Sequence, residues 1–301
     1  MYKKLVFVTL GLILTLLSSM RPILAHTVLE KVAKTGVLTA GTSKDAFPFA
    51  YKNEKGQLTG YSVDMLKLIE KQLEQELKRP IALKLVAVDP EDRIPNLLTN
   101  KVDIVCDASS FTWEREQDVD FSVSYGLTGT RLLVKHGLSL WGPETLVGKR
   151  IGALPKTTNE QSIRQAQPKA QIVLVNDRAA GYKALQEGKI DAFASDGVLL
   201  EGWLQTTSNA DKFDIVGYPY SDEGIACMLP ENNSTFRDTV NYALIRFMQG
   251  FLTGKQPDVA IFDRWFGSHG AAPLNKDLRD SFTENMRLTV DSLEQLPERV
   301  F

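Results

Sequence analysis

Residues 81–106 read IALKLVAVDPEDRIPNLLTNKVDIVC, and this stretch decides the fold class. Its first part, Ile81 to Val88, alternates in side-chain character well enough for a strand. Pro90 then takes the first position of a helix that runs through Leu98, where a missing amide hydrogen is tolerated. The next strand is Val102 to Cys106. The order strand, helix, strand predicts a mainly parallel sheet and an α/β fold.

The same alternation continues on both sides of this stretch. Upstream, 37–41 is a short β-rich run, and 63–77 is predicted to be a helix because its apolar residues recur every four positions. Downstream, strands and helices alternate from 150 to 216. Amphipathic helices follow at 235–248 and around 259–265. The chain therefore holds two α/β units.

No Pro- or Ser-rich linker separates these two units. Short apolar strands at 131–135 and 224–229 bracket the second one, which is the pattern of a domain inserted into another, with both crossings serving as a hinge. We therefore expect a discontinuous first lobe of residues 26–134 and 226–301. The second lobe is expected to span residues 135–225.

Residues 1–25 have the pattern of a secretory signal peptide. Lys3 and Lys4 form the charged region, Leu5 to Leu17 is an apolar run, and Ala25 offers a small residue for cleavage. The apolar run is short for a bilayer span. A retained membrane anchor is the alternative. The pattern places the mature protein outside the cytoplasm.

Charge and composition narrow the class of partner. Apolar content of 43% and charged content of 24% are those of a soluble globular protein. The net charge is −2, and cleavage of the signal peptide would remove Lys3, Lys4 and Arg21 and leave −5. No basic stripe appears, which argues against a nucleic-acid partner. The balance suits a soluble monomer.

Neither the histidines nor the cysteines are spaced for a metal. His26, His136 and His269 are scattered singly, and Cys106 and Cys227 stand 121 positions apart. We expect no metal and no other cofactor.

A set of short motifs runs through the mature chain in a defined order. No single one is specific, but their order and spacing together are. They are FPFAY at 47–51, GYSVD at 60–64, DRIP at 92–95, WER at 113–115, GTRLL at 129–133, KTTNE at 156–160, FASD at 193–196, ACML at 226–229 and FDRWF at 262–266.

With these motifs the chain resembles the polar amino-acid-binding proteins of bacterial ABC importers (solute-binding protein family three), and most of all the glutamate/aspartate-binding ones. The resemblance implies the two-lobed type II periplasmic-binding-protein fold, with two hinge strands and a ligand cleft between the lobes. It also implies a periplasmic protein without enzymatic activity. Its partners would be a free amino acid and an inner-membrane permease, which reads the closed form.

An α-amino acid presents a carboxylate and an ammonium group, so its cleft needs a cation or free amides on one side and a carboxylate on the other. Arg115 matches the family's arginine for the α-carboxylate, against the alternative of a surface arginine. Thr157 and Thr158 stand at a helix N-terminus, where free amides suit a carboxylate and a plain N-cap is the alternative. Asp196 matches the ammonium acceptor, with a helix cap as the alternative.

Three further residues on the first lobe match ligand contacts of the family. Ser109 and Ser110 match its small hydroxyl residues, and an ordinary turn is the alternative. Phe49, within the aromatic run 47–51, would form a wall over the carbon chain of the ligand. Core packing is the alternative for these rings.

The side chain of the ligand is expected to meet the distal half of the cleft. Arg93 matches a cation of acidic-ligand members, and Arg178 stands where such relatives carry histidine. Ser43 stands where they carry arginine, so one cation is lost. Two guanidinium groups in a desolvating cleft repel each other unless an anion lies between them. We therefore expect glutamate or aspartate, with glutamine as the rival.

The resemblance also gives the two cysteines a structural role. In this fold the strand at 102–106 neighbours the strand at 224–229. Cys106 and Cys227 could then lie within disulfide reach. Two buried free thiols are the alternative.

Two other functions compete with transport. Periplasmic cyclohexadienyl dehydratases resemble these binding proteins and use a carboxylate as general acid in the cleft. A sensing module of a receptor or a lytic enzyme is the second alternative. No evident catalytic pair appears in the sequence, so a binding protein is expected.

Overall fold

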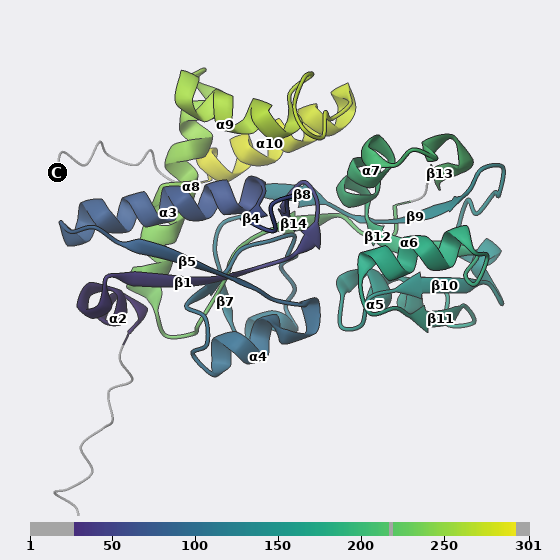
Figure 1. Cartoon of the computed structure of the whole chain (residues 1–301), viewed down its shortest axis with the longest axis horizontal. Helices are drawn as coiled ribbons and strands as arrows, with labels where there is room; N and C mark the ends of the chain where they lie inside the picture. Colours follow the sequence, from purple (N-terminus) through teal and green to yellow (C-terminus); the bar gives the residue numbers. More distant parts are fainter. Residues whose placement is uncertain (1–26, 217–218, 293–301) are drawn as a thin grey trace, which may run out of the picture.

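The computed structural model describes residues 27–216 and 219–292 (Figure 1). The expected signal peptide, 1–25, lies outside the described residues. Within them, no helix is both long and apolar enough to cross a membrane. The described chain forms two lobes side by side, each built on a five-stranded sheet. The expected two-lobed α/β architecture is confirmed.

The first sheet carries the stretch that decided the fold class. Strand β1 pairs in parallel with β5 on one side and β6 on the other, whereas β15 runs antiparallel to β6 and β7. Helices α3 and α4 lie on opposite sides of this sheet (Figure 1). The strands, in sheet order, are β5 (Ala82–Ala87), β1 (Val37–Thr42), β6 (Ile104–Val105), β15 (Met228–Leu229) and β7 (Asp120–Phe121). The helices of this lobe are α2 (Val28–Thr35), α3 (Tyr61–Leu77), α4 (Arg93–Leu98), α8 (Ser234–Leu252), α9 (Gln256–Phe266) and α10 (Lys276–Asp291).

Helix α3 shows how sequence spacing becomes core. Met65, Ile69 and Leu73 recur every four residues and are fully buried in the main hydrophobic cluster. Gly60 precedes the helix with φ +139°, and a Cβ there would stand 2.1 Å from the Phe49 carbonyl oxygen. Only glycine therefore allows the backbone at the start of α3 to pass so close to the backbone of Phe49.

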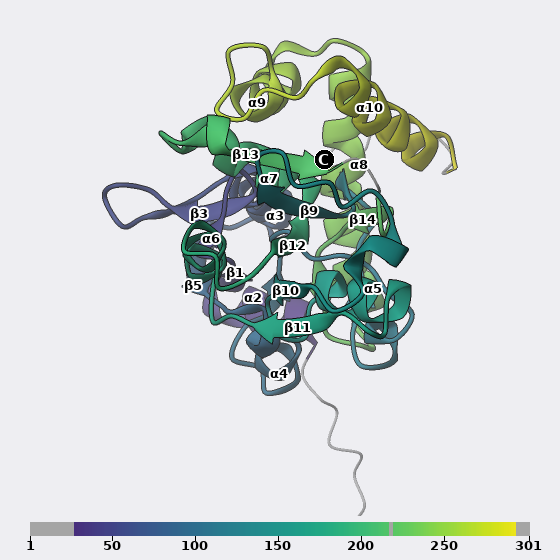
Figure 2. The ribbon, with the colours of Figure 1, turned by 90° about the vertical axis from the view of Figure 1, so that its right-hand side faces the viewer.

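The second sheet has a core on both faces. Strand β10 pairs in parallel with β11 and β12, and β9 runs antiparallel to β12 and β13. Leu132 and Val134 of β9 enter one hydrophobic cluster, and Leu133 between them enters another. Figure 2 views this lobe from its outer end. Its strands, in sheet order, are β11 (Gln171–Leu174), β10 (Arg150–Ala153), β12 (Ala192–Asp196), β9 (Thr130–Lys135) and β13 (Phe213–Val216), and its helices are α5 (Thr158–Ala166), α6 (Arg178–Gln186) and α7 (Gly197–Thr206).

Smaller elements complete the fold. A small three-stranded sheet lies between β1 and α3 in the chain. Its strands are β2 (Asp45–Ala46), β3 (Ala50–Lys52) and β4 (Leu58–Thr59). Short 3₁₀ turns are η2 (Pro90–Asp92), η3 (Arg115–Gln117), η4 (Pro143–Leu146) and η5 (Ala210–Lys212).

The chain crosses between the lobes on one pair of strands. Strand β8 (Gly126–Thr128) pairs antiparallel with β14 (Glu223–Ile225), between the two five-stranded sheets (Figure 1). Residues 130–134, expected in the first lobe, hydrogen-bond within the second sheet instead. An apolar run in the sequence predicts a strand, but it does not predict which of the two sheets that strand joins. We therefore propose β8 and β14 as the hinge and as the division between lobes.

The two cysteines lie on neighbouring strands of the first lobe. Cys106 follows β6 and Cys227 precedes β15, and the two form a disulfide with a Cα–Cα distance of 4.4 Å. Both are fully buried. The bond ties β6, which precedes the crossing to the second lobe, to β15, which follows the return.

Candidate ligand-binding cleft

The carboxyl ends of the parallel strands gather polar residues from both lobes. In sheets of this kind, the crevice outside those ends is where ligands bind. Ser43 directly follows β1, and Asp107 lies two residues beyond β6, in the first lobe. In the second lobe Thr157 lies beyond the end of β10, and Asp196 is the last residue of β12. All four of these residues are buried. Within the described chain, no group of His, Cys, Asp and Glu side chains could hold a metal ion.

Arg93 does not stand alone in the first lobe. Its Nη2 lies 2.9 Å from Oδ2 of Asp107, and its Nε donates a hydrogen bond of 2.9 Å to the same oxygen. The hydroxyl of Ser43 donates to Oδ2 at 2.7 Å, and that of Ser109 donates to Oδ1. All four side chains are buried. Arg93 is thus neutralised by a carboxylate that the sequence analysis missed, although Asp107 directly follows a buried strand.

Arg178 also has a carboxylate partner, and that partner comes from the other lobe. Its Nη1 donates to Oδ1 of Asp45 at 2.7 Å, and its backbone amide donates to Oδ2 at 3.1 Å. Burial alone would raise the pKa of Asp45, but the charge and hydrogen bonds of Arg178 lower it below its ordinary value. The premise that Arg93 and Arg178 form a pair of unpartnered cations is therefore wrong.

Arg115 spans the cleft at a second point. Its Nη1 donates to the Ser110 carbonyl oxygen at 2.8 Å within the first lobe, and its Nη2 donates to the Lys156 carbonyl oxygen at 3.3 Å in the second. Burial, together with the positive charge of Arg93, lowers the pKa of Arg115 to about 10. The guanidinium remains charged at neutral pH. This cation therefore touches both lobes.

Asp196 ends β12 and occupies the N-cap position of α7, yet its side chain makes no capping hydrogen bond. The helix-cap alternative is therefore wrong. Burial first, and then the negative charge of Glu223, raises the pKa of Asp196 to about 6, although Arg178 and Arg93 act in the opposite direction. A buried carboxylate with a second carboxylate nearby is a suitable acceptor for a ligand cation.

Thr157 and Thr158 have separate roles at the start of α5. Thr157 caps the helix by accepting from the Glu160 amide at 3.3 Å, as the plain N-cap alternative required. Thr158 donates at 2.7 Å to Oε2 of Glu223, a buried carboxylate of the hinge strand β14. Glu223 also accepts from Thr130 at 3.3 Å. The Thr158–Glu223 contact could not be predicted from the sequence, because its partners are 65 residues apart in the chain.

The remaining expected contacts are structural in this arrangement. Phe49 is fully buried in the core of the first lobe, where its ring centroid lies 5.9 Å from Tyr61 and 5.8 Å from Phe266. Core packing is thus the favoured role for this ring. Ser110 bridges to Ile225 of β14 and offers its carbonyl to Arg115.

The lobes touch around the rim of the cleft. Besides the Asp45–Arg178 and Arg115–Lys156 contacts, Gln161 donates to Glu114 at 3.1 Å. Gln205 of α7 donates at 3.1 Å to the carbonyl oxygen of Pro273, between α9 and α10. These contacts join the two lobes in the arrangement described.

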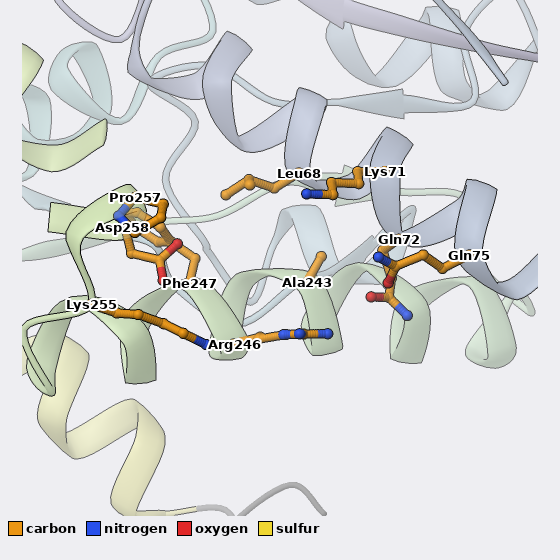
Figure 3. A pocket seen from close by; sticks show the side chains of 10 residues that line it. All are labelled: Leu68, Lys71, Gln72, Gln75, Ala243, Arg246, Phe247, Lys255, Pro257 and Asp258. Carbon is orange, nitrogen blue, oxygen red and sulfur yellow. The ribbon is translucent and has the colours of Figure 1, made fainter. Parts of the chain in front are cut away.

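A different pocket, of about 200 Å³, lies between α3 and α8 (Figure 3). Three cationic side chains, Lys71, Arg246 and Lys255, line it with one carboxylate, Asp258. It is formed by first-lobe residues alone. None of the residues expected to bind ligand contributes to it.

Comparison with known proteins identifies a matching family and several similar proteins. Residues 38–268 match the model of the bacterial extracellular solute-binding proteins, family 3. The chain is 27% identical over 268 residues to a glutamate/aspartate import solute-binding protein of Salmonella typhimurium, with 87% of each chain covered. Among solved structures, an ancestral arginine-binding protein bound to glutamine has a TM-score of 0.69 at 28% identity, covering 77% of this chain and 99% of that one. An ancestral amino acid-binding protein, a precursor of cyclohexadienyl dehydratase, has a TM-score of 0.67 at 26% identity, covering 79% and 99%.

Proposed function

The chain belongs to the bacterial extracellular solute-binding proteins, family 3, and from this premise we propose that it captures a free amino acid in the cleft between its lobes for an ABC importer. One observation carries the proposal. A half-buried cation, Arg115, and a buried carboxylate, Asp196, are contributed by different lobes and interact electrostatically. Such a pair matches the two charged groups that every α-amino acid presents.

In this proposal the α-carboxylate and the α-ammonium group of the ligand each bind a defined part of the protein. Arg115 grips the α-carboxylate with two parallel donors, and the free amides at the start of α5, beside Thr158, add to this site. Asp196 accepts the ammonium group. Because these two parts lie on different lobes, the ligand completes the closed form by bridging them.

The side chain of the ligand is a finer question. The name of the Salmonella relative supports glutamate or aspartate, and the solved neighbour supports glutamine. At 27–28% identity the family is shared, whereas the ligand need not be. An acidic ligand needs cations without partners in the distal half of the cleft, and both Arg93 and Arg178 already have carboxylate partners.

Amino-acid affinity is expected to fall as pH drops through about 6. Asp196 must be ionised to accept an ammonium group, and burial in this arrangement raises its pKa to about 6. Binding must therefore expel a proton at lower pH, which costs about tenfold in affinity for each pH unit below the pKa. Calorimetric titrations between about pH 7.5 and pH 5 measure this slope. Constant affinity over that range would remove Asp196 from the ammonium site.

Ligand binding is expected to make the protein more compact. Without a ligand, the contacts of Arg178 with Asp45 and of Arg115 with Lys156 can break while β8 and β14 flex as a hinge. Small-angle scattering should give a smaller radius of gyration when a saturating amino acid is added to ligand-free protein. A profile that stays the same at saturation would contradict hinge closure.

The cellular setting follows from the same proposal. The signal peptide expected at 1–25 directs the chain to the periplasm, where a monomer carries its ligand to an inner-membrane permease. The family description, which names extracellular solute-binding proteins, supports export.

One observation favours a second candidate, an enzyme of the cyclohexadienyl dehydratase type. Asp196, with a pKa raised to about 6, could serve as a general acid. The solved neighbour that is a precursor of such an enzyme has a comparable fold. Incubation with prephenate and arogenate separates the two candidates, because only the enzyme releases an aromatic product.

A further inference from the structure

We propose that Asp45 and Asp107 make the distal half of the cleft select an uncharged carboxamide side chain, as in glutamine and asparagine, over an acidic one. This inference rests on the proposed function and names its class of ligand. Neither aspartate was singled out from the sequence. Both were found because each holds one of the two arginines that were expected to face an anionic side chain.

The first arginine is paired with a carboxylate of its own lobe through Nε and Nη2. Asp107 is 0% exposed, and its two oxygens together accept from Arg93, Ser43 and Ser109. A buried ion pair is stable only when the other hydrogen-bonding atoms of its charged groups have partners. Both oxygens of Asp107 have such partners. A ligand carboxylate placed beside Arg93 would have to share that cation with Asp107 at short range. The repulsion between the two carboxylates opposes an acidic ligand.

The second arginine is engaged across the cleft but retains a free donor. Arg178 is 3% exposed, and Asp45 of the opposite lobe occupies its Nη1 and its backbone amide. Its Nε is buried and, among the described residues, has no hydrogen-bond partner. A buried donor without a partner is costly, so the site calls for an acceptor, which an amide oxygen supplies without adding a charge. A lysine- or arginine-like side chain offers only donors and would leave Nε unsatisfied.

The charge balance of the cleft points the same way. Among the described residues, the cleft cluster consists of three guanidinium groups and four carboxylates, namely Arg93, Arg115, Arg178, Asp45, Asp107, Asp196 and Glu223, each of which acts electrostatically on others of the set. Lys44 also acts on Asp45 but is paired with Asp89, so these groups together carry one negative charge in excess. A zwitterion with a carboxamide side chain leaves this balance unchanged, whereas glutamate or aspartate adds a second buried negative charge. A buried charge without a partner is strongly disfavoured.

The test is a calorimetric competition with L-glutamine, L-asparagine, L-glutamate, L-aspartate and L-arginine on ligand-free full-length mature protein. Wild type is expected to bind the better amide at least about tenfold more tightly than the corresponding acid. Asp45→Asn and Asp107→Asn each free one arginine charge while keeping the shape of the side chain, so each should lower the amide-to-acid affinity ratio by about tenfold. Asp191→Asn is the matched control. It breaks an aspartate–arginine pair with Arg150, where β10 begins and away from the carboxyl ends of the strands.

Each outcome decides a different point. Tighter binding of an acid or of arginine by wild type overturns the inference and leaves the proposed function standing, whereas binding of no amino acid contradicts the proposed function itself. An amide preference that Asp45→Asn leaves unchanged overturns the assignment to these aspartates. This variant also decides the matter if Asp107→Asn does not fold, because Asp45 is only partly buried.

Discussion

Replacing Arg115 by alanine is expected to weaken amino-acid binding by about 2–5 kcal/mol, which raises the dissociation constant between roughly thirtyfold and several thousandfold. The guanidinium contacts carbonyl oxygens on both lobes and stays charged, with its pKa at about 10. A ligand carboxylate between the lobes would replace these neutral acceptors with a charged one, in a cleft that excludes water. Alanine removes both donors and leaves the carboxylate buried without its cation.

Two variants give this result its controls. Arg115→Lys keeps the charge but loses the two parallel donors, so it should bind with intermediate affinity. Arg150→Ala removes an arginine that pairs with Asp191 away from the cleft, and should bind as wild type does. Calorimetry measures the affinity of each variant, and urea denaturation measures its free energy of unfolding. Wild-type affinity in Arg115→Ala would remove this residue from the ligand site.

Removing the disulfide is expected to lower the free energy of unfolding by about 2–5 kcal/mol. The Cys106–Cys227 bond closes a loop of 121 residues that contains the whole second sheet. Cross-linking so long a loop restricts the unfolded chain strongly. Urea denaturation of the Cys106→Ala/Cys227→Ala variant measures the loss.

Cavity formation also contributes to that loss, because both cysteines are fully buried. Wild type unfolded with and without a reducing agent isolates the cross-link, since its side chains otherwise stay the same. Equal free energies of unfolding for the oxidised and reduced protein would contradict the stabilising role of the bond. Cys227→Ala alone, under reducing conditions, then measures the packing of one side chain.

The elements of the fold could be predicted from the sequence where periodicity is local. The stretch 81–106 forms the expected strand, helix and strand, and the four-residue spacing of Met65, Ile69 and Leu73 marks the buried face of α3. The division between lobes was less predictable. An apolar run such as 131–135 does not show which sheet its hydrogen bonds join, and they join the second.

The candidate site divides in the same way. Arg93, Arg115 and Asp196 were found because their types and positions match a family pattern, and Arg178 because it stands where relatives carry histidine. Their partners were not, because pairing depends on the tertiary fold: Asp45 and Arg178 are 133 residues apart. A motif therefore gave the cations of the cleft without the carboxylates that neutralise them, and the expected preference for an acidic ligand followed from that omission.

Isothermal titration of ligand-free protein against each of the common amino acids tests the central claim most directly. The protein should be unfolded and refolded first, so that no amino acid retained in the cleft conceals the site. The account predicts saturable binding of a polar amino acid at a single site, and loss of that binding in Arg115→Ala. A folded, ligand-free protein that binds none of these amino acids would contradict it.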